Sequence, residues 1–552
     1  MSSIPPPHAP TEAALGSLRD ELKGNMFPNV HGFFAKYFEG KSWSTVTQNK
    51  WQETTSANMV GKLSVRVPDL AHLDVQVEWL AEFQTLFFGS TAGSTRVFGE
   101  FHLDTAPVTA DDDDDDILRF CERARHLFKT QSARCFVHGF LVRGAMLKLW
   151  VFDRSGAYSS ERLDLAQKPD LLVRALAGYT FMTDEEAGFN TFVKRLPPES
   201  DSYVTFNQRH TFRLWPELMA TADYIVGPGT TCYAASTQTA GEPNTVIKFS
   251  WREDQEPTEV RLLKLAHERN AWGVIQLLDH QDLVNVADLH QEMDFPRPFA
   301  NRILSCVATT PLGRPIRQFA SIPELLEALR DLVRALHSLY VKARILHRDV
   351  AIKNLIIAPH RSADSPKGVL LDFNFALDLD SVRPVEPMVG SDGFMAIGIL
   401  SGQRHTYRHD LESLFYVFLW IAIANDGVHD EANDILEDMP KTSRLWKWCS
   451  MDFGAVGRDK AADMSPEGFE GILAEFCSDF APLRGLAREL HALLFPMRQG
   501  KIFTGTDTDP VAVERLHDGM ADAFNRSALC PGIPRLTLGV SSLDHFRGHR
   551  WL

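Results

Sequence analysis

The amino-acid sequence predicts an α+β fold in which an α/β accessory region comes first, a β-rich lobe second and a helical lobe third. Alternating apolar and polar runs around turns indicate strands at residues 135–142, 146–152 and 245–249. Leucines recur at helical spacing along residues 325–339, and residues 411–421 are apolar on nearly every side, as in a buried helix. The predicted strands therefore gather in the first half of the chain and the longest helices in the second.

Composition and charge narrow the classes of partner. The chain has 552 residues, of which 44% are hydrophobic and 23% charged, as in ordinary globular proteins. A net charge of −15 without a basic stripe argues against nucleic-acid binding. Seven scattered cysteines without a C-x-x-C pair predict reduced thiols. The N-terminus lacks a signal-peptide pattern, and the longest apolar run is shorter than the ~20 residues of a membrane span. We therefore expect an intracellular protein, cytoplasmic or nuclear, without a membrane partner.

Five segments are expected along the chain. They are a disordered N-terminus at 1–30, the α/β accessory domain at 31–204, the β-rich lobe at 205–310, the helical lobe at 311–500 and a C-terminal tail at 501–552 with little pattern. The first segment is rich in Pro and Ala, a composition typical of disorder.

The accessory domain contains two distinctive stretches. Six consecutive aspartates at 111–116 predict a solvated loop ahead of a helix at 117–129, because like charges repel each other. Calcium binding is the alternative, although no EF-hand spacing is present. Further on, the turn Asp153-Arg154-Ser155-Gly156 leads from the second strand into a third, which predicts an antiparallel meander.

One pattern in the accessory domain resembles restriction-type nucleases. Pro68-Asp69 and Glu100-Phe101-His102 are similar to the P-D…(D/E)-x-K motif, whose carboxylates hold Mg²⁺. His102 stands where that motif has lysine, so the fixed charge is missing. We expect Asp69 and Glu100 to lie near one another in a mixed sheet at residues 60–155, without nuclease activity. The alternative is an ordinary α/β domain with two surface acids.

The β-rich lobe begins with a glycine turn. The pattern of residues 224–234 predicts a strand, a turn and a second strand, and the predicted strand 245–249 carries Lys248. A helix should open near Glu256, because Pro257 suits the first turn of a helix. The strand 303–307 then leads into the helical lobe, whose first helix follows a capping box at residues 321–324.

The segment 347–354 points to phosphoryl transfer. It has the pattern H-R-D-x-x-x-x-N, and Asp372-Phe373 follows the next apolar strand. Phosphoryl transfer needs a carboxylate that accepts the proton of the attacking hydroxyl, and oxygen ligands for the Mg²⁺ that contacts the triphosphate. Asp349 suits the first role, and Asn354 and Asp372 suit the second.

The sequence that follows resembles a known family. Residues 390–398 read G-S-D-G-F-M-A-I-G, similar to the kinase segment G-T-x-x-Y-x-A-P-E, and Asp410 stands where the buried aspartate of the kinase αF helix belongs. With Y-R-H-D-L-E-S at 407–413, these motifs resemble the fungal-type protein kinase family over roughly residues 60–500. The resemblance implies a bilobal protein kinase-like fold, ATP and Mg²⁺ as cofactors, and a protein substrate.

The resemblance also implies roles for individual residues. Those expected to bind ATP are Gly227, Gly229, Ala234, Lys248 and Glu259. Those expected to act in catalysis are Asp349, Lys353 and Ser391, with Asn354 and Asp372 as metal ligands and His347, Arg348 and Asp410 in structural roles. Glu256 is the alternative to Glu259 as the partner of Lys248, and residues 308–311 should form the adenine hinge. Ser391 should hydrogen-bond Asp349 and not serve as an activating phosphorylation site. His405 and His409 should be structural.

Three departures from the kinase pattern bear on activity. Cys232 replaces the third glycine of the turn, Asn374 replaces the D-F-G glycine, and Gly398 replaces the A-P-E glutamate that anchors the activation segment. Losing one partner of a buried ion pair commonly costs ~3–5 kcal/mol. We expect an active Ser/Thr-type protein kinase. The alternatives are a pseudokinase or nucleotide-dependent scaffold, favoured by Gly398 and Cys232, and a small-molecule phosphotransferase, against which Arg348 and Phe373 argue.

Overall fold

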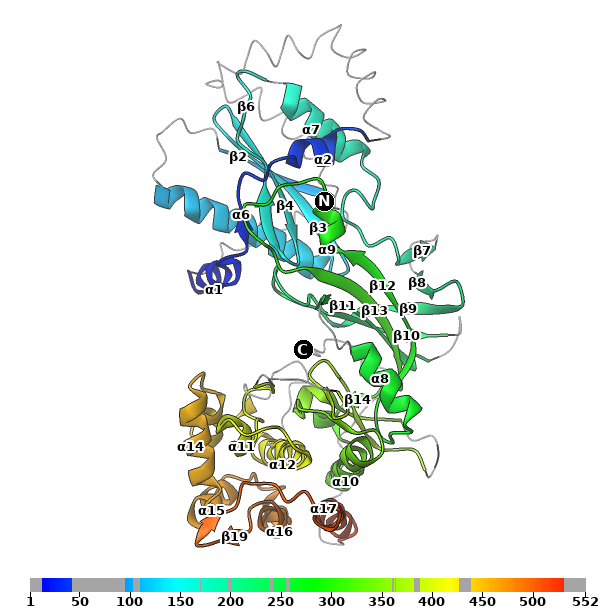
Figure 1. Ribbon diagram of the computed structural model, residues 1–552, viewed down its shortest axis with the longest axis vertical. Coiled ribbons are helices and arrows are strands. Elements are labelled where there is room, and N and C mark those ends of the chain that lie inside the picture. The colour runs from blue at the N-terminus through cyan, green and yellow to red at the C-terminus, as the bar shows by residue number, and fades with distance from the viewer. Residues whose placement is uncertain are drawn as a thin grey trace.

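Two β-sheets and a layer of helices follow one another along the longest axis of the molecule (Figure 1). The computed structural model describes residues 12–41, 95–102, 110–168, 170–196, 201–237, 242–254, 259–359, 362, 364–381, 388–425 and 438–530. Helices and strands are mixed, as the predicted α+β class requires. Among the described helices, none is both long enough and apolar enough to cross a membrane.

The first sheet has six strands in the order β1-β5-β4-β3-β2, with β6 beside β4. Its strands are β1 (Met26–Phe27), β2 (Val97–His102), β3 (Phe136–Arg143), β4 (Met146–Asp153), β5 (Gly156–Ser159) and β6 (Leu163–Asp164). Strands β3, β4 and β5 form the predicted antiparallel meander. The outer strands β1 and β2 pair in parallel with β5 and β3.

Helices cover both faces of this first sheet. Helices α1 (Glu12–Leu22) and α6 (Ala110–Thr130) pack on one face, where Trp150 and Phe152 of β4 are buried. Helices α2 (Phe33–Phe38) and α7 (Asp170–Phe181) pack on the other, against Leu149 and Val151. The alternation of β4 residues between the two faces follows from the two-residue period of a strand.

Two sequence expectations for this part were wrong. The six aspartates lie within α6 and not in a loop ahead of it. Acidic residues are favoured in the first turns of a helix because they complement the positive end of its dipole. The expected disorder up to residue 30 does not hold for α1, because Leu18 and Leu22 are buried against α6.

The second sheet has seven strands, all antiparallel, in the order β12-β13-β11-β10-β9-β8-β7. Its strands are β7 (Lys194–Leu196), β8 (Asp201–Phe206), β9 (His210–Ala220), β10 (Thr231–Ser236), β11 (Thr245–Glu253), β12 (Gln276–Asn285) and β13 (Arg302–Thr310). Helix α8 (Glu259–Glu268) follows β11, and α9 (Val286–Leu289) follows β12. Because β7 starts at Lys194, the sheet begins before the boundary expected at residue 205.

One hydrophobic core joins the two sheets. The same cluster of buried side chains contains Tyr158 of the first sheet and Phe206 and Phe249 of the second. Phe295, in the connection between β12 and β13, contacts Phe27 and Tyr158 with ring centroids 5.4 and 5.3 Å apart. Apolar burial of this kind is the main driving force of folding, so the two sheets stabilise each other.

The helical layer is built around α10 (Ile322–Val341) and α12 (Tyr407–Ala424). Every residue of α12 is buried, as its apolar sequence predicted. Among the described residues, the other α-helices of this layer are α11 (Ile397–Leu400), α14 (Phe453–Asp463), α15 (Pro466–Ala474), α16 (Arg484–Leu494) and α17 (Pro510–Ala528). The short strands are β14 (Arg314–Pro315), β15 (Ile345–Leu346), β16 (Leu355–Ile357), β17 (Gly368–Leu370), β18 (Leu377–Asp378), β19 (Met497–Arg498) and β20 (Lys501–Ile502).

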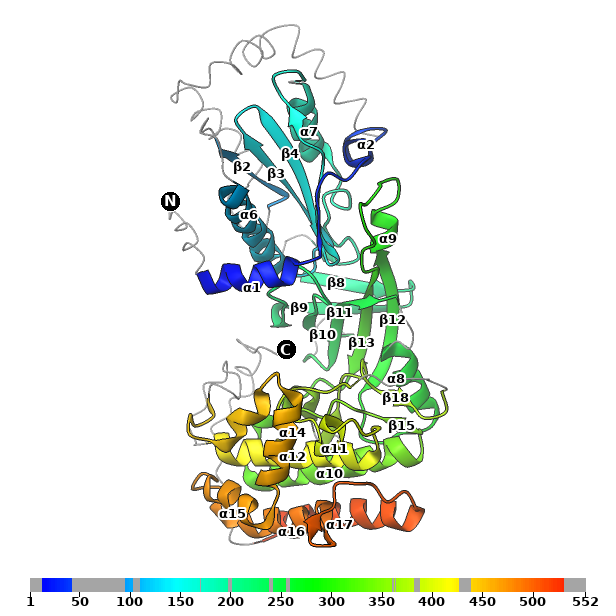
Figure 2. The same ribbon diagram turned by 60° about the vertical axis from the view of Figure 1, so that its left-hand side comes forward.

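Helix α17 lies in the segment that was expected to be a tail with little pattern. It runs beside α10 at the end of the molecule (Figure 2), and Val513, Met520 and Phe524 are buried in the core of the helical layer. Those three residues have helical spacing, which was the signal that could have revealed the helix.

Candidate active site

The loop between β15 and β16 is bound at its start by the carboxylate of Asp410. Asp410, at the start of α12, accepts hydrogen bonds from the backbone N–H groups of His347 and Arg348, both at 2.9 Å. Its Oδ1 also accepts a hydrogen bond from His405 Nε2 at 2.9 Å. Burial opposes ionisation of Asp410, but His405 and His347 outweigh it and lower the pKa of this carboxyl below its ordinary value. Asp410, at the start of α12, thus fixes the backbone of the loop at His347 and Arg348.

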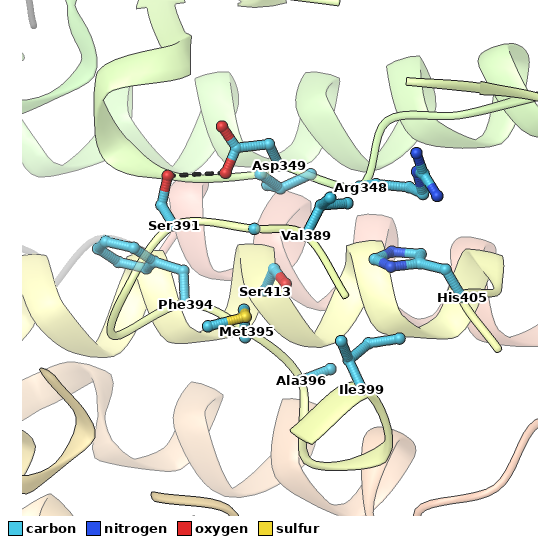
Figure 3. A pocket seen from close by; sticks show the side chains of 12 residues that line it. Arg348, Asp349, Val389, Ser391, Phe394, Met395, Ala396, Ile399, His405 and Ser413 are labelled. Atoms are coloured by element: carbon cyan, nitrogen blue, oxygen red, sulfur yellow. Dashed lines mark hydrogen bonds between the residues drawn. The ribbon is translucent and has the colours of Figure 1, made fainter. Parts of the chain in front are cut away.

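Asp349 is buried in this loop, and both of its carboxylate oxygens accept a hydrogen bond. Ser391 Oγ donates to Oδ1 at 2.7 Å (Figure 3), and Asn354 Nδ2 donates to Oδ2 at 2.9 Å. The same Asn354 nitrogen donates to the backbone oxygen of Asp349 at 2.9 Å. The structure therefore brings Asp349, Asn354 and Ser391 together. Lys353 lies in the same loop and is exposed.

Asp372 lies just beyond β17, with a left-handed backbone conformation (φ 57°). Its Oδ1 accepts a hydrogen bond from the N–H of Asn374 at 3.1 Å and lies 3.8 Å from Lys248 Nζ. Burial raises the pKa of Asp372, but Lys248 and the Asn374 N–H lower it more, so the net shift is downward. His347 fixes the neighbouring backbone, because its Nε2 donates to the oxygen of Leu371 at 2.8 Å.

Lys248 of β11 and Glu259 of α8 form an ion pair with Nζ and Oε2 3.0 Å apart. The other oxygen of Glu259 accepts a hydrogen bond from the N–H of Phe373 at 3.4 Å. Burial lowers the pKa of Lys248, but the carboxylates of Asp372 and Glu259 raise it more, so the net pKa lies above its ordinary value. Lys248 is therefore a fixed cation between two acids. Glu256, the alternative partner, lies outside the described residues.

The glycine turn contacts the first sheet. The N–H of Gly227 donates to the backbone oxygen of Arg154 at 3.0 Å, and a Cβ at Gly229 would lie 2.4 Å from Arg154 Nε. In the ladder between β10 and β11, Cys232 is the partner of Lys248, and Ala234 is the buried partner of Val246. Burial raises the pKa of Cys232 to about 12, which keeps its thiol protonated at neutral pH.

The segment 390–398 is held without the glutamate that Gly398 replaces. Lys460 of α14 donates from Nζ to the backbone oxygens of Gly393 and Met395, at 2.9 and 2.7 Å. Glu412 of α12 accepts a hydrogen bond from the N–H of Ile397 at 2.7 Å and is paired with Arg408. Sequence reasoning missed Lys460, because nothing in the pattern of α14 marks it as a buried residue.

The ring of His409 occupies the space that a side chain at position 398 would need. A Cβ at Gly398 would lie 2.4 Å from His409 Nε2, closer than side chains approach. His409 also caps α12, because its Nδ1 accepts a hydrogen bond from the N–H of Thr406 at 3.1 Å. His405 and His409 thus have the structural contacts that the sequence predicted.

A narrow hollow, too small to hold a water molecule, lies beside Asp349 under the segment 389–399 (Figure 3). Its apolar lining comes from Val350, Val389, Phe394, Met395, Ala396 and Ile399. His405 and Ser413 contribute polar groups. Asp349 therefore borders a narrow hollow, lined by both apolar and polar side chains, between the segment 389–399 and α12.

The structure describes only part of the nuclease-like pattern. Glu100 of β2 forms an ion pair with Arg123 of α6, with Oε1 and Nε 2.9 Å apart. Asp69 lies outside the described residues, so the expected pairing of the two acids stays a prediction. Over the part of the chain that is described, no three His, Cys, Asp or Glu residues gather in a way that could hold a metal ion by themselves.

A family model described as fungal protein kinase matches residues 95–422. The match covers more than half of the 552 residues. It runs from just before β2 almost to the end of α12, so it contains the second sheet, every strand of the first sheet except β1, and the kinase-motif residues from Gly227 to Glu412.

Proposed function

Because the chain belongs to the fungal protein kinase family, we propose that it transfers the γ-phosphate of ATP to a serine or threonine hydroxyl of a protein substrate. The observation that carries this proposal is the geometry around Asp349. Its carboxylate accepts hydrogen bonds from Ser391 and Asn354. Lys248 of β11 forms ion pairs with Glu259 of α8 and with Asp372, which follows β17. We assign the second sheet and α8 to the small lobe of a bilobal kinase fold, and α10–α17 to the large lobe.

The role of Asp349 is to orient the acceptor hydroxyl and take its proton. A carboxylate does this best when its oxygens are fixed before the substrate arrives. The hydrogen bonds from Ser391 and Asn354 provide that fixation.

Lys248 has the charge and the position to bind the phosphates of ATP. Its ion pair with Glu259 keeps the ammonium group on the inner side of β11, and its raised pKa keeps that group charged. Positive charge placed before the reaction stabilises a phosphoryl-transfer transition state without reorganisation of the site.

Asp372 and Asn354 fit a site for Mg²⁺. Mg²⁺ prefers oxygen ligands and usually takes only one or two carboxylates from a protein, with phosphate oxygens and water completing the shell. The lowered pKa of Asp372 keeps it anionic. Asn354 uses its amide nitrogen in both hydrogen bonds to Asp349, so its amide oxygen is the atom it offers to a metal. A bound Mg²⁺ would neutralise charge on the phosphates during transfer.

The absence of the A-P-E glutamate at Gly398 was the main sequence argument for a scaffold, and the contacts of the segment 390–398 weaken it. Gly398 does not leave the segment 390–398 without support, because Lys460 and Glu412 bind its backbone. The active-kinase function is therefore better supported than the scaffold.

A labelling assay tests the proposal. Purified protein with γ-labelled ATP, Mg²⁺ and a mixture of proteins should transfer label to protein, and Lys248→Met should reduce this strongly because the phosphates lose their cation. Lys501→Met, at an exposed lysine of β20, is the matched control and should behave as wild type. Nucleotide binding by the wild type without any transfer would favour the scaffold.

A further inference from the structure

The glycine turn of the proposed nucleotide site is held by the first sheet. Arg154 lies in the β4–β5 turn and is 1% exposed. Its guanidinium donates from Nη1 to the backbone oxygens of Tyr224 and Ile225, at 2.6 and 3.3 Å. Its own backbone oxygen accepts the N–H of Gly227 at 3.0 Å. Arg154, which lies outside the second sheet, therefore binds both carbonyl and N–H groups of the turn backbone.

Helix α1 contributes a second contact to the same turn. Glu21 Oε1 accepts hydrogen bonds from the N–H groups of Ile225 and Val226, at 2.6 and 2.8 Å. Together with Gly227, three successive N–H groups of the turn are bound by α1 and the β4–β5 turn. Figure 2 shows α1 lying next to this end of the second sheet.

The β4–β5 turn is itself rigid. Asp153 Oδ1 accepts the N–H groups of Ser155 and Gly156 at 2.7 and 3.1 Å, and its Oδ2 lies 2.6 Å from His290 Nε2 in the second sheet's β12–β13 connection. The guanidinium of Arg154 lies 4.2 Å from the ring centre of Phe128 on α6. Burial lowers the pKa of Arg154 only to about 10, so the side chain stays charged at neutral pH.

The far side of the glycine turn is tied to the strand that carries Lys248. The oxygen of Pro228 accepts the N–H of Trp251 at 2.7 Å, three residues after Lys248 on β11. Gly229 must be glycine here, because a Cβ would lie 2.4 Å from Arg154 Nε and the residue has φ 51°. The turn is thus fixed between the first sheet and β11.

We propose that Arg154 and Glu21 are positioning residues that hold the glycine turn in place, so that the N-terminal α/β part of the chain sets the affinity of the site for ATP. This inference rests on the proposed function. A glycine-rich turn that moves freely must be ordered when the nucleotide binds, whereas a turn that is already fixed avoids that cost. The first sheet therefore acts on nucleotide binding more than on the chemical step.

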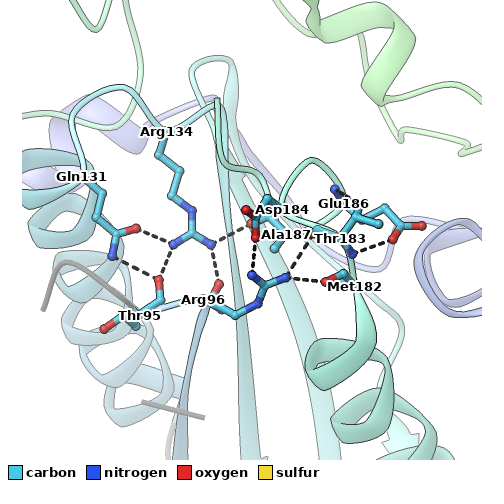
Figure 4. Close-up of polar contacts among 9 residues, drawn as sticks. All are labelled: Thr95, Arg96, Gln131, Arg134, Met182, Thr183, Asp184, Glu186 and Ala187. Carbon is cyan, nitrogen blue, oxygen red and sulfur yellow. Dashed lines mark hydrogen bonds and ion pairs between the residues drawn. The ribbon is translucent and has the colours of Figure 1, made fainter. Parts of the chain in front are cut away.

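The experiment compares Arg154→Gln and Glu21→Gln with Arg134→Gln in the full-length protein. Arg134 is the matched control because it is also a buried arginine, and its acceptors, which include the backbone oxygens of Thr95 and Ala187, lie outside the segment 224–230 (Figure 4). The measurements are the dissociation constant for Mg-ATP, kcat and KM for ATP, thermal stability, and hydrogen exchange of the segment 224–230.

We expect Arg154→Gln to speed exchange in 224–230 and to raise both the Mg-ATP dissociation constant and KM about tenfold, with kcat nearly unchanged. Glu21→Gln should shift the same quantities in the same direction by less, since its amide oxygen still accepts hydrogen bonds. Arg134→Gln should lower thermal stability without changing affinity.

Three outcomes would overturn the inference. Faster exchange in 224–230 with unchanged affinity would show that the turn is not part of the nucleotide site. An equal loss of affinity in Arg134→Gln would show a general effect of destabilisation. Unchanged exchange in Arg154→Gln would show that the contact does not hold the turn. A wild-type protein that binds no Mg-ATP would instead refute the proposed function, and the exchange data would still report on the contact.

Discussion

The two oxygens of the Asp349 carboxylate are held by side chains that are far apart in sequence. Ser391 comes from the segment after β18 and Asn354 from the same loop as Asp349. Hydrogen bonds to a charged group contribute about 1.5–3 kcal/mol each, which is enough to decide the orientation of a carboxylate. The kinase pattern predicted Ser391 as a partner of Asp349, whereas Asn354 was predicted only as a metal ligand.

Removing the Ser391 hydroxyl should impair catalysis. Ser391→Ala leaves Oδ1 of Asp349 without its donor, and we expect kcat to fall about tenfold or more, with little change in KM for ATP. Steady-state kinetics would measure this. Ser391→Thr keeps the hydroxyl and is the control that should retain most of the activity. Activation by Ser391→Asp would contradict this role and indicate a phosphorylation site.

Other residues at this scale had no signal in the sequence. Lys460 and Arg154 are long charged side chains that the sequence alone would place on the surface, since such residues are rarely fully buried. The structure buries both, because each finds backbone oxygens that accept its hydrogen bonds. Only the three-dimensional path of distant segments creates those acceptors.

At the scale of elements, the segment 390–398 depends on α12 and α14. Lys460 is buried beneath it and contacts the rings of Tyr416 and Trp448, with Nζ 4.3 and 4.8 Å from their centres. Glu412, Cys449 and Asp392 are the ionisable groups that favour its charge. Burial outweighs them and lowers the pKa of Lys460 from 10.5 to about 7.

The lowered pKa predicts a specific pH dependence of stability. Between pH 7 and 10.5 the unfolded chain binds a proton at Lys460 that the native state has released, so the free energy of unfolding should rise with pH in this window. The neutral amine still has the N–H groups to serve both carbonyl oxygens.

Denaturant unfolding of wild type and Lys460→Met at pH 7, 8 and 9 checks this pH dependence. The stability difference in favour of the wild type should grow with pH, because methionine does not titrate. A difference that stays constant or shrinks would contradict the prediction.

Restoring the glutamate of the A-P-E motif should harm this protein. In Gly398→Glu the new side chain meets His409, whose Nε2 would lie 2.4 Å from the Cβ. Overpacking of a buried site typically costs ~1–3 kcal/mol, so thermal unfolding should occur at a lower temperature. Gly398→Ala should show a smaller loss, and adding His409→Ala should recover part of it. Higher stability or activity in Gly398→Glu would mean that the segment lacks an anchor.

The order of the elements was largely predictable, whereas their extents were not. The meander 136–159, the strand of Lys248 and the buried helix α12 followed from periodicity. Helix α6 begins at Ala110, earlier than predicted, because acidic residues in the first turns interact favourably with the positive end of the helix dipole. Helix α17 was missed because its apolar positions are separated by charged residues.

At the scale of the whole molecule, the two sheets share one core. Phe295 from the second sheet's β12–β13 connection packs on Phe27 and Tyr158 of the first. Burying one such side chain contributes roughly 1.5–3 kcal/mol, and several contribute here. Sequence reasoning placed a domain boundary at residue 205, because a change in pattern does not reveal which apolar faces meet.

A fragment that begins at Lys194 should therefore be unstable. Without the first sheet, apolar side chains around Phe249 and Phe295 lose the partners that cover them. We expect the fragment to aggregate, or to unfold at a clearly lower temperature than the full-length protein. Sedimentation and circular dichroism would measure this. A soluble fragment with the melting temperature of the full-length chain would show that the shared core is dispensable.

The central claim is that Asp349 acts on the acceptor while Asp372 acts on the nucleotide. The most direct test measures the phosphoryl-transfer rate and the Mg-ATP dissociation constant for Asp349→Asn and Asp372→Asn. Asp349→Asn should lower the rate by about 10²–10⁴-fold and leave the dissociation constant within about threefold of wild type. Asp372→Asn should impair both, because the metal loses its charged ligand. Transfer at the wild-type rate by Asp349→Asn would contradict the account.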